Sequence, residues 1–160
     1  MRWATVLLTA TSIAAAGCST LRPYREAYPE NLTFSVTGGS LLTSTEVTLS
    51  IFFADAACNK TYQGSVSLSP GEAPERIGLP TDRNVYARIR AESHGWLQNS
   101  SKTRTHEFRL QPRRGHQYGV EYVHEKKAYA MRLTETDSRT GKTQELRGDD
   151  WSACERQPPV

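Results

Sequence analysis

The sequence predicts an all-β fold, an antiparallel β-sandwich of about seven or eight strands. Three observations lead to this prediction. Apolar residues repeat at every second position in most runs after residue 30, turn-forming residues separate the runs, and no stretch there has the i, i+3, i+4, i+7 apolar spacing of an amphipathic helix. Short strands separated by turns are typical of two antiparallel sheets packed face to face.

Length and composition agree with a single domain. The chain has 160 residues, of which 37% are hydrophobic and 23% are charged. This composition is too polar for a multispan membrane protein and too apolar for a disordered chain. The net charge of +3 is lower than nucleic-acid-binding domains usually carry, so we expect no nucleic-acid partner.

The first residues predict an export signal. Arg2 precedes residues 4–16, a run of Ala, Val, Leu, Ile, Thr and Ser. This run is shorter than the roughly 20 apolar residues that span a bilayer. An apolar run of this length at the N-terminus is typical of a secretory signal peptide, which is removed after export. We assign residues 1–17 to this signal peptide.

The tetrapeptide that follows the run is Ala15-Ala16-Gly17-Cys18. It resembles the lipobox of bacterial lipoproteins, in which the Cys becomes the new N-terminus and carries acyl chains. The resemblance implies a lipid anchor at Cys18, since two or more acyl chains hold a protein stably on a membrane. Ser19 resembles the residue at this position in outer-membrane lipoproteins, which implies a periplasm-facing protein in a Gram-negative host.

A tether is expected between the anchor and the domain. Residues 18–30 contain two prolines and show no periodicity, and the sandwich is assigned to residues 31–160. The first three strands are expected at residues 32–36, 46–53 and 62–68. Gly38-Gly39-Ser40 separates the first two, and Ser69-Pro70-Gly71 ends the third, because Pro fixes φ and Gly permits a positive φ.

The same alternation continues to the end of the domain. Further strands are expected at residues 85–91, 106–110, 118–124, 128–134 and 143–147. Residues 137–141, Asp-Ser-Arg-Thr-Gly, predict a hairpin connection between the last two strands.

One segment suggests which kind of sandwich to expect. Residues 110–122, Leu-Gln-Pro-Arg-Arg-Gly-His-Gln-Tyr-Gly-Val-Glu-Tyr, are similar to the Leu-x-Pro-Gly…Tyr-x-Val segment of fibronectin-III-like and transthyretin-like domains. The resemblance implies an immunoglobulin-like or transthyretin-like β-sandwich. It also implies a tyrosine corner, in which the hydroxyl of Tyr118 returns to the backbone toward Arg114.

Two cysteines remain once Cys18 is acylated. Cys58 and Cys154 form an even pair in an exported chain, where disulfides persist, and we predict that they are bonded. The bond would attach the C-terminal tail to the early part of the domain. The alternative, a zinc site, would require Cys-x-x-Cys or a close Cys-His pair, and the sequence contains neither.

The sequence contains no complete catalytic motif. His106-Glu107 and His124-Glu125 lack the second His of H-E-x-x-H and lie in strand-like runs. G-x-S-x-G, the P-loop and the dinucleotide-binding glycine motif are also absent. Asp149 and Asp150 leave a glycosidase-like carboxylate pair as an alternative. We expect no enzymatic activity, cofactor or metal.

Basic residues are concentrated in one region. Residues 76–114 contain nine Lys or Arg and three acidic residues. Arg, Tyr and Trp are enriched at protein interfaces, and side chains two residues apart share a strand face. The candidate binding surface comprises Tyr86, Arg88, Arg90, Trp96, Arg113 and Arg114. Solvated strand faces without a partner are the alternative.

Together these observations favour a lipid-anchored, non-enzymatic envelope lipoprotein that acts as a periplasmic binding or adaptor module. The expected partners are the membrane, a periplasmic protein and, as a further candidate, an anionic envelope polymer. One alternative is an inhibitor or immunity protein, whose acidic loop Asp149-Asp150-Trp151 would plug the cleft of a cell-wall hydrolase. Another is an envelope hydrolase or carbohydrate-binding module, which would require clustered carboxylates or an exposed aromatic platform.

Overall fold

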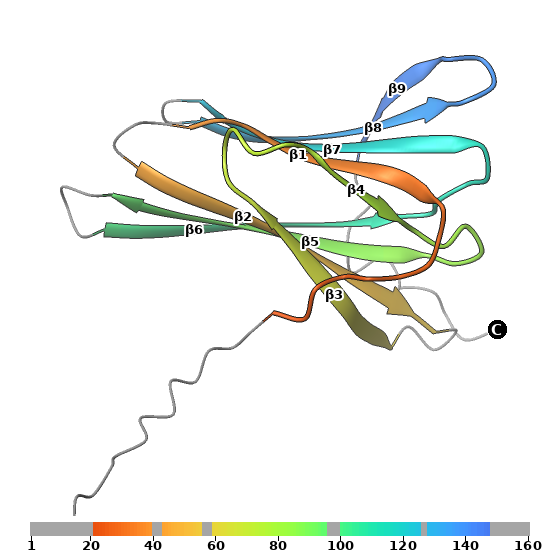
Figure 1. The fold of residues 1–160 in the computed structure, drawn as a ribbon, viewed down its shortest axis with the longest axis horizontal. Helices are drawn as coiled ribbons and strands as arrows, with labels where there is room; N and C mark the ends of the chain where they lie inside the picture. Colours follow the sequence, from red (N-terminus) through yellow and green to blue (C-terminus); the bar gives the residue numbers. More distant parts are fainter. Residues whose placement is uncertain (1–20, 40–42, 56–58, 96–99, 126–127, 148–160) are drawn as a thin grey trace, which may run out of the picture.

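The chain folds into two β-sheets packed face to face, which confirms the all-β sandwich (Figure 1). The computed structural model describes residues 21–39, 43–55, 59–95, 100–125 and 128–147. Within these ranges there are nine strands and no helix. The strands are β1 (Glu30–Gly38), β2 (Thr43–Ala54), β3 (Lys60–Leu68), β4 (Glu75–Gly78), β5 (Val85–Gly95), β6 (Ser100–Leu110), β7 (His116–Glu125), β8 (Ala128–Asp137) and β9 (Thr143–Leu146).

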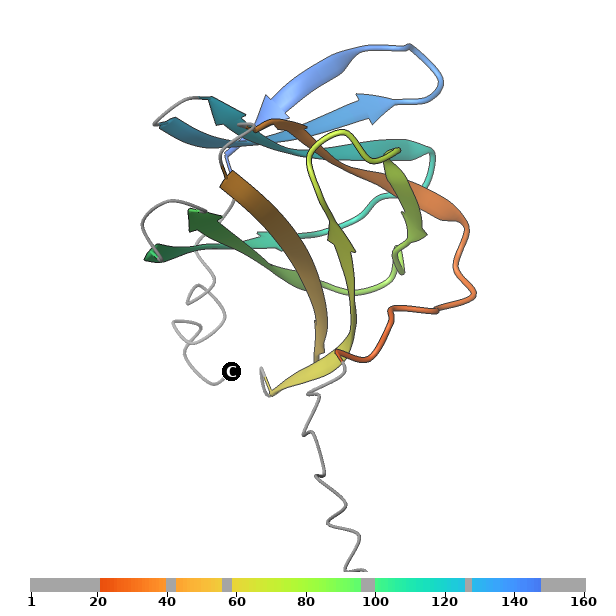
Figure 2. The ribbon, with the colours of Figure 1, turned by 60° about the vertical axis from the view of Figure 1, so that its left-hand side comes forward.

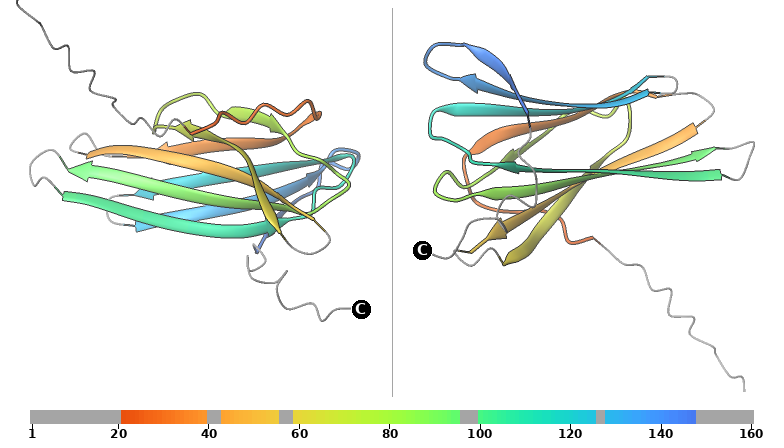
Figure 3. Two further views of the ribbon diagram at one scale, coloured as in Figure 1. Left: turned by 90° about the horizontal axis from the view of Figure 1, so that it is seen from below. Right: turned by 180° about the vertical axis from the view of Figure 1, so that it is seen from behind.

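One sheet has five strands and the other has four. Their orders are β4-β1-β7-β8-β9 and β3-β2-β5-β6, and Figures 2 and 3 show the two layers from other directions. All strand pairs are antiparallel except β1 and β7, which run parallel. The expectation of a wholly antiparallel sandwich was therefore wrong for this pair. Parallel neighbours need a long crossover, which the chain from β2 to β6 provides here; β2, β3, β5 and β6 form the other sheet, and β4 pairs with β1.

Eight of the nine strands coincide with alternating runs. The strand that the pattern missed is β4, because only four residues pair there and the first two are exposed. The run at residues 106–110 proves to be the end of the longer β6, whose polar first half pairs with β5 as far as Ser100 opposite Gly95. The hairpin expected at residues 137–141 is confirmed, with Gly141 at φ 70°.

The core lies between the sheets and follows the predicted alternation. The first sheet contributes Phe34, Val120 and Leu133, and the second contributes Leu49 and Ile89; each is at most 2% exposed. Each fully buried side chain of this kind stabilises the fold by roughly 1.5–3 kcal/mol. Alternation therefore sets both the strands and the face that each strand buries.

The segment before β1 packs along the free edge of β3. The Tyr24 amide donates a hydrogen bond to the Ser65 carbonyl (3.0 Å), and the Ser65 amide donates to the Arg22 carbonyl (2.9 Å). Tyr24 is buried, and its hydroxyl donates to the Gly78 carbonyl at 2.7 Å. Residues 22–24 were expected to belong to a tether, but they contact the sandwich (Figure 2).

Several predicted features lie outside the described residues. These are Cys18 with the signal peptide, both members of the predicted disulfide (Cys58 and Cys154), Trp96, and the acidic loop with Asp149 and Asp150. They stay predictions. Within the described part of the chain, no helix is both long enough and apolar enough to span a bilayer.

Candidate functional site

The strip of basic and aromatic residues expected on β5 consists of Tyr86, Arg88 and Arg90, and it presents little unpaired charge. Tyr86 is fully buried, so it offers no aromatic surface to a partner. Lys60 covers its ring, with the ammonium nitrogen 5.0 Å from the ring centre. The Nε of Arg88 lies 2.6 Å from a carboxylate oxygen of Glu107 on β6, and Arg90 lies 2.6 Å from Glu92. Each arginine of the strip therefore has a carboxylate beside it.

A group of hollows lies at one end of the sandwich instead. The β4–β5, β6–β7 and β8–β9 connections meet there (Figure 1). Three adjoining hollows of about 290, 440 and 360 Å³ open at this end, and Arg113 lines all three. We call this region the Arg113 end. It contains Arg113 and Arg114 of the predicted surface.

A buried carboxylate holds Arg113 in place. The Glu135 side chain is 5% exposed, and the guanidinium of Arg113 contacts both of its oxygens, at 3.0 Å from Nε and 2.7 Å from Nη2. Tyr118 donates its hydroxyl proton to Glu135 at 2.8 Å, and the Gln144 amide donates to the other oxygen at 2.8 Å. The His116 Nδ1 lies 3.2 Å from the first oxygen. Strands β7, β8 and β9 thus meet at one carboxylate.

These contacts determine the charge of Glu135. Burial alone would raise its pKa, but the hydrogen bonds from Arg113, Tyr118 and Gln144 outweigh burial and lower the pKa to about 2. Glu135 is therefore ionised at neutral pH and has no proton to donate as a general acid. The same pairing raises the pKa of Arg113. The arrangement is suited to positioning Arg113, whose side chain is still 57% exposed.

The expected tyrosine corner is present. The Tyr118 hydroxyl accepts a hydrogen bond from the backbone amide of Arg113 at 3.0 Å, five residues upstream. The return contact was expected near Arg114 and is made one residue earlier. The hydroxyl thus links the β6–β7 connection to Glu135, so it orders both the backbone and the side chain of Arg113.

The surface of the Arg113 end is more basic than acidic. Residues lining its hollows include five cations and three carboxylates. Glu135 is paired with Arg113, and Glu30 lies 3.4 Å from Arg76. Asp137 accepts the Arg139 and Thr140 amides in the hairpin turn, which lowers its pKa. The five cations are Arg109, Arg113, Arg114, Lys142 and Arg147.

Sequence reasoning missed Glu135, His116 and Gln144. A signal for Glu135 was available, because it continues the inward series of Met131 and Leu133 at two-residue spacing. A carboxylate at an inward position requires a partner in the fold. His116 and Gln144 carry no comparable signal, because their contact with Glu135 depends on the register of β7 and β9 against β8.

The described residues assemble no metal site. They contain no group of three or more His, Cys, Asp or Glu side chains placed to bind a metal ion. Comparison of the chain with protein families, with curated proteins and with solved structures finds no match.

Proposed function

We propose that this protein is a lipid-anchored, non-enzymatic envelope lipoprotein, and that it serves as a periplasmic adaptor docking an acidic partner protein at the Arg113 end. The observation that carries the proposal is the group of adjoining hollows around Arg113, whose rim has an excess of cations. Concave sites of this kind, lined by arginine, are typical of recognition surfaces.

The order of Arg113 supports a recognition role. Arginine is enriched at interface hot spots, and a guanidinium that is already positioned loses less side-chain entropy on binding. Glu135 holds the guanidinium, yet more than half of the side chain is exposed. Arg114 and Lys142 are exposed beside it and line neighbouring hollows. An acidic partner surface would complement this rim and would be attracted over a distance.

The strand order favours the transthyretin-like architecture over the immunoglobulin-like one. In the immunoglobulin fold, the second and third strands lie in different sheets. Here β2 and β3 form a hairpin within one sheet. This likeness concerns architecture, and architecture alone implies no activity.

The docking proposal is tested by reversing exposed charges at the Arg113 end. A chain with Arg114→Glu and Lys142→Glu keeps the Glu135 network, because neither residue contacts that carboxylate. We expect cross-linked affinity purification from the envelope to recover the partner of the wild-type protein at least about tenfold less well with this chain. Lys102→Glu, an exposed charge reversal on β6, is the matched control and should recover it normally. Equal recovery with all three chains would rule out docking at this end.

The identity of the recovered protein separates the proposal from its alternative. A structural component of the envelope supports the adaptor, whereas a cell-wall hydrolase that loses activity in the complex would indicate an inhibitor. The anchor is tested separately with Cys18→Ala. This chain should leave the membrane fraction, and its retention there at high salt would contradict the anchor.

A further inference from the structure

The position of the N-terminal segment bears on how an anchored protein would sit on its membrane. Backbone hydrogen bonds join Arg22 and Tyr24 to Ser65 of β3, and the Tyr24 hydroxyl binds Gly78 of β4. The two backbones also lie close together, because a Cβ at Gly64 would lie 2.5 Å from the Cα of Tyr24. From Arg22 onward the segment is therefore part of the sandwich.

This attachment leaves little chain between the sandwich and a lipid at Cys18. Four residues lead from Cys18 to Arg22. Extended chain advances at most about 3.6 Å per residue, which gives a reach of roughly 14 Å. A lipid on Cys18 would therefore keep the β3 side of the sandwich close to the headgroups.

The side chains exposed on this side are suited to a bilayer surface. Leu21 is 55% exposed and is the one large apolar side chain exposed among the described residues. Arg22 and Arg25 are exposed beside it, whereas Glu26, the one carboxylate in residues 21–29, is half-buried. Tyr62 on β3 donates its hydroxyl to the Arg22 carbonyl at 3.3 Å. Apolar side chains and arginines together favour an interface with anionic headgroups.

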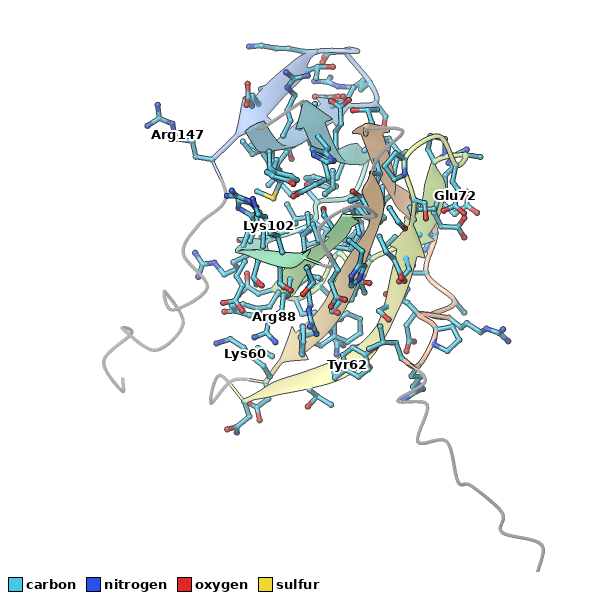
Figure 4. The ribbon with its side chains drawn as sticks, turned by 90° about the vertical axis from the view of Figure 1, so that its left-hand side faces the viewer. Lys60, Tyr62, Glu72, Arg88, Lys102 and Arg147 are labelled. Atoms are coloured by element: carbon cyan, nitrogen blue, oxygen red, sulfur yellow. The ribbon has the colours of Figure 1, made fainter. Side chains whose placement is uncertain are left out.

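We propose that this surface, the anchor face formed by Leu21, Arg22, Arg25 and Tyr62, lies on the anionic headgroups of the membrane that holds Cys18. The inference rests on the lipid anchor of the proposed function. Contact of the anchor face with the membrane would orient the whole protein, because β9 lies across the sandwich from the N-terminal segment in Figures 1 and 2. Figure 4 likewise shows Tyr62 and Arg147 at opposite sides of the molecule. The hairpin of β8 and β9 would then face away from the membrane.

The experiment compares arginine reactivity in two lipidated full-length chains on the same vesicles. One chain is wild type, and the other carries a 20-residue Gly/Ser spacer between Thr20 and Leu21, whose mean span is roughly 25 Å. Both are reconstituted in vesicles of phosphatidylcholine and phosphatidylglycerol and treated with phenylglyoxal, and modified arginines are quantified by mass spectrometry. We expect Arg22 and Arg25 to react roughly fivefold more slowly in the wild type. Arg139 and Arg147, on the far side, should react equally in both chains.

Equal rates at Arg22 and Arg25 in the two chains would overturn the proposal. A second set of vesicles, containing phosphatidylcholine alone, tests the headgroup chemistry. The protection should largely disappear there, and unchanged protection would contradict recognition of anionic headgroups.

Vesicle flotation separates this inference from the proposed anchor. If the wild type floats but its anchor face reacts as fast as in the spacer chain, the orientation is wrong and the anchor stands. If the wild type does not float, both the anchor and the orientation built on it are wrong.

Discussion

Tyr118 connects the backbone of the Arg113 end to its buried carboxylate. Its hydroxyl accepts a hydrogen bond from the partly buried Arg113 amide and donates one to the buried Glu135, so a single oxygen atom serves both groups. Tyr118→Phe removes that oxygen without emptying the ring site. We expect the free energy of unfolding, measured by urea denaturation, to fall by about 1–3 kcal/mol.

Tyr62→Phe is the matched control for this change. The Tyr62 hydroxyl makes one exposed bond, at 3.3 Å, to the Arg22 carbonyl. Its removal should change the free energy of unfolding by less than about 0.5 kcal/mol. Equal losses of free energy of unfolding in the two variants would mean that the tyrosine corner stabilises the fold no more than one exposed hydrogen bond does.

Glu135 should contribute to the acid sensitivity of the fold. Its pKa is lowered from 4.5 to about 2 in the folded protein, so the folded state binds its proton less readily than the unfolded state does. The stability that it contributes is therefore complete above about pH 4.5 and is lost as the pH falls toward 2. Glu135→Gln should destabilise the protein by about 1–3 kcal/mol at pH 7 and by less at each lower pH in that window.

Urea denaturation at several pH values measures this difference. Glu145→Gln, an exposed carboxylate on the neighbouring β9, is the control and should follow the wild type throughout. A Glu135→Gln deficit that stays constant from pH 7 to pH 2.5 would contradict the role assigned to this carboxylate.

The local sequence predicted the contacts and burial of some residues but not of others. Tyr118 was predictable because its contact is made five residues away, within one connection. The ion pair of Arg113 with Glu135 spans 22 residues and depends on the pairing of β7 with β8. The burial of Tyr86 was missed because period two assigns a residue to a face but does not say what covers that face.

At the scale of elements, alternation predicted strands well where they are long and have one buried face. It failed for β4, which is too short to show a period, and for the polar first half of β6, which is a strand because β5 pairs with it. The parallel pairing of β1 with β7 was also inaccessible, since alternation carries no information about strand direction.

The contact between β3 and the N-terminal segment provides a test at this scale. Gly64 has φ 153°, and an added Cβ would lie 2.5 to 2.9 Å from backbone atoms of Pro23 and Tyr24. Gly64→Ala should therefore displace the segment from β3 and lower the free energy of unfolding by about 2–4 kcal/mol. Limited trypsin digestion should show faster cleavage after Arg25.

Gly71→Ala separates the effect of the close approach from that of backbone strain. Gly71 also has a positive φ, 90°, but no atom lies within 4 Å of an added Cβ. It should lose only about 1–2 kcal/mol of free energy of unfolding and keep the wild-type rate of cleavage after Arg25. If trypsin cleaves Gly64→Ala at the wild-type rate as well, the segment is not held by this contact.

At the scale of the whole molecule, the two proposed surfaces lie on different sides of one rigid sandwich. The anchor face is attached to β3 of the four-stranded sheet, and the Arg113 end includes the hairpin of β8 and β9 in the other sheet. One hollow of the Arg113 end is lined by Tyr28, Pro29 and Glu30 of the N-terminal segment, so a partner would reach this end from the hairpin of β8 and β9, which would face away from the membrane.

The predicted disulfide would join these sheets covalently. Cys58 follows β2 and precedes β3, whereas Cys154 follows β9 at the far edge of the other sheet. Because the bond would close a loop of about 100 residues, chain entropy predicts a stabilisation of roughly 4.7 kcal/mol. Non-reducing mass spectrometry should find a peptide linking Cys58 to Cys154. Cys58→Ser and Cys154→Ser should each lower the free energy of unfolding by the same amount as the double variant, because either change removes the whole bond. Free thiols at both positions, or losses that add in the double variant, would show that the two sheets are held together by their apolar core without this bond.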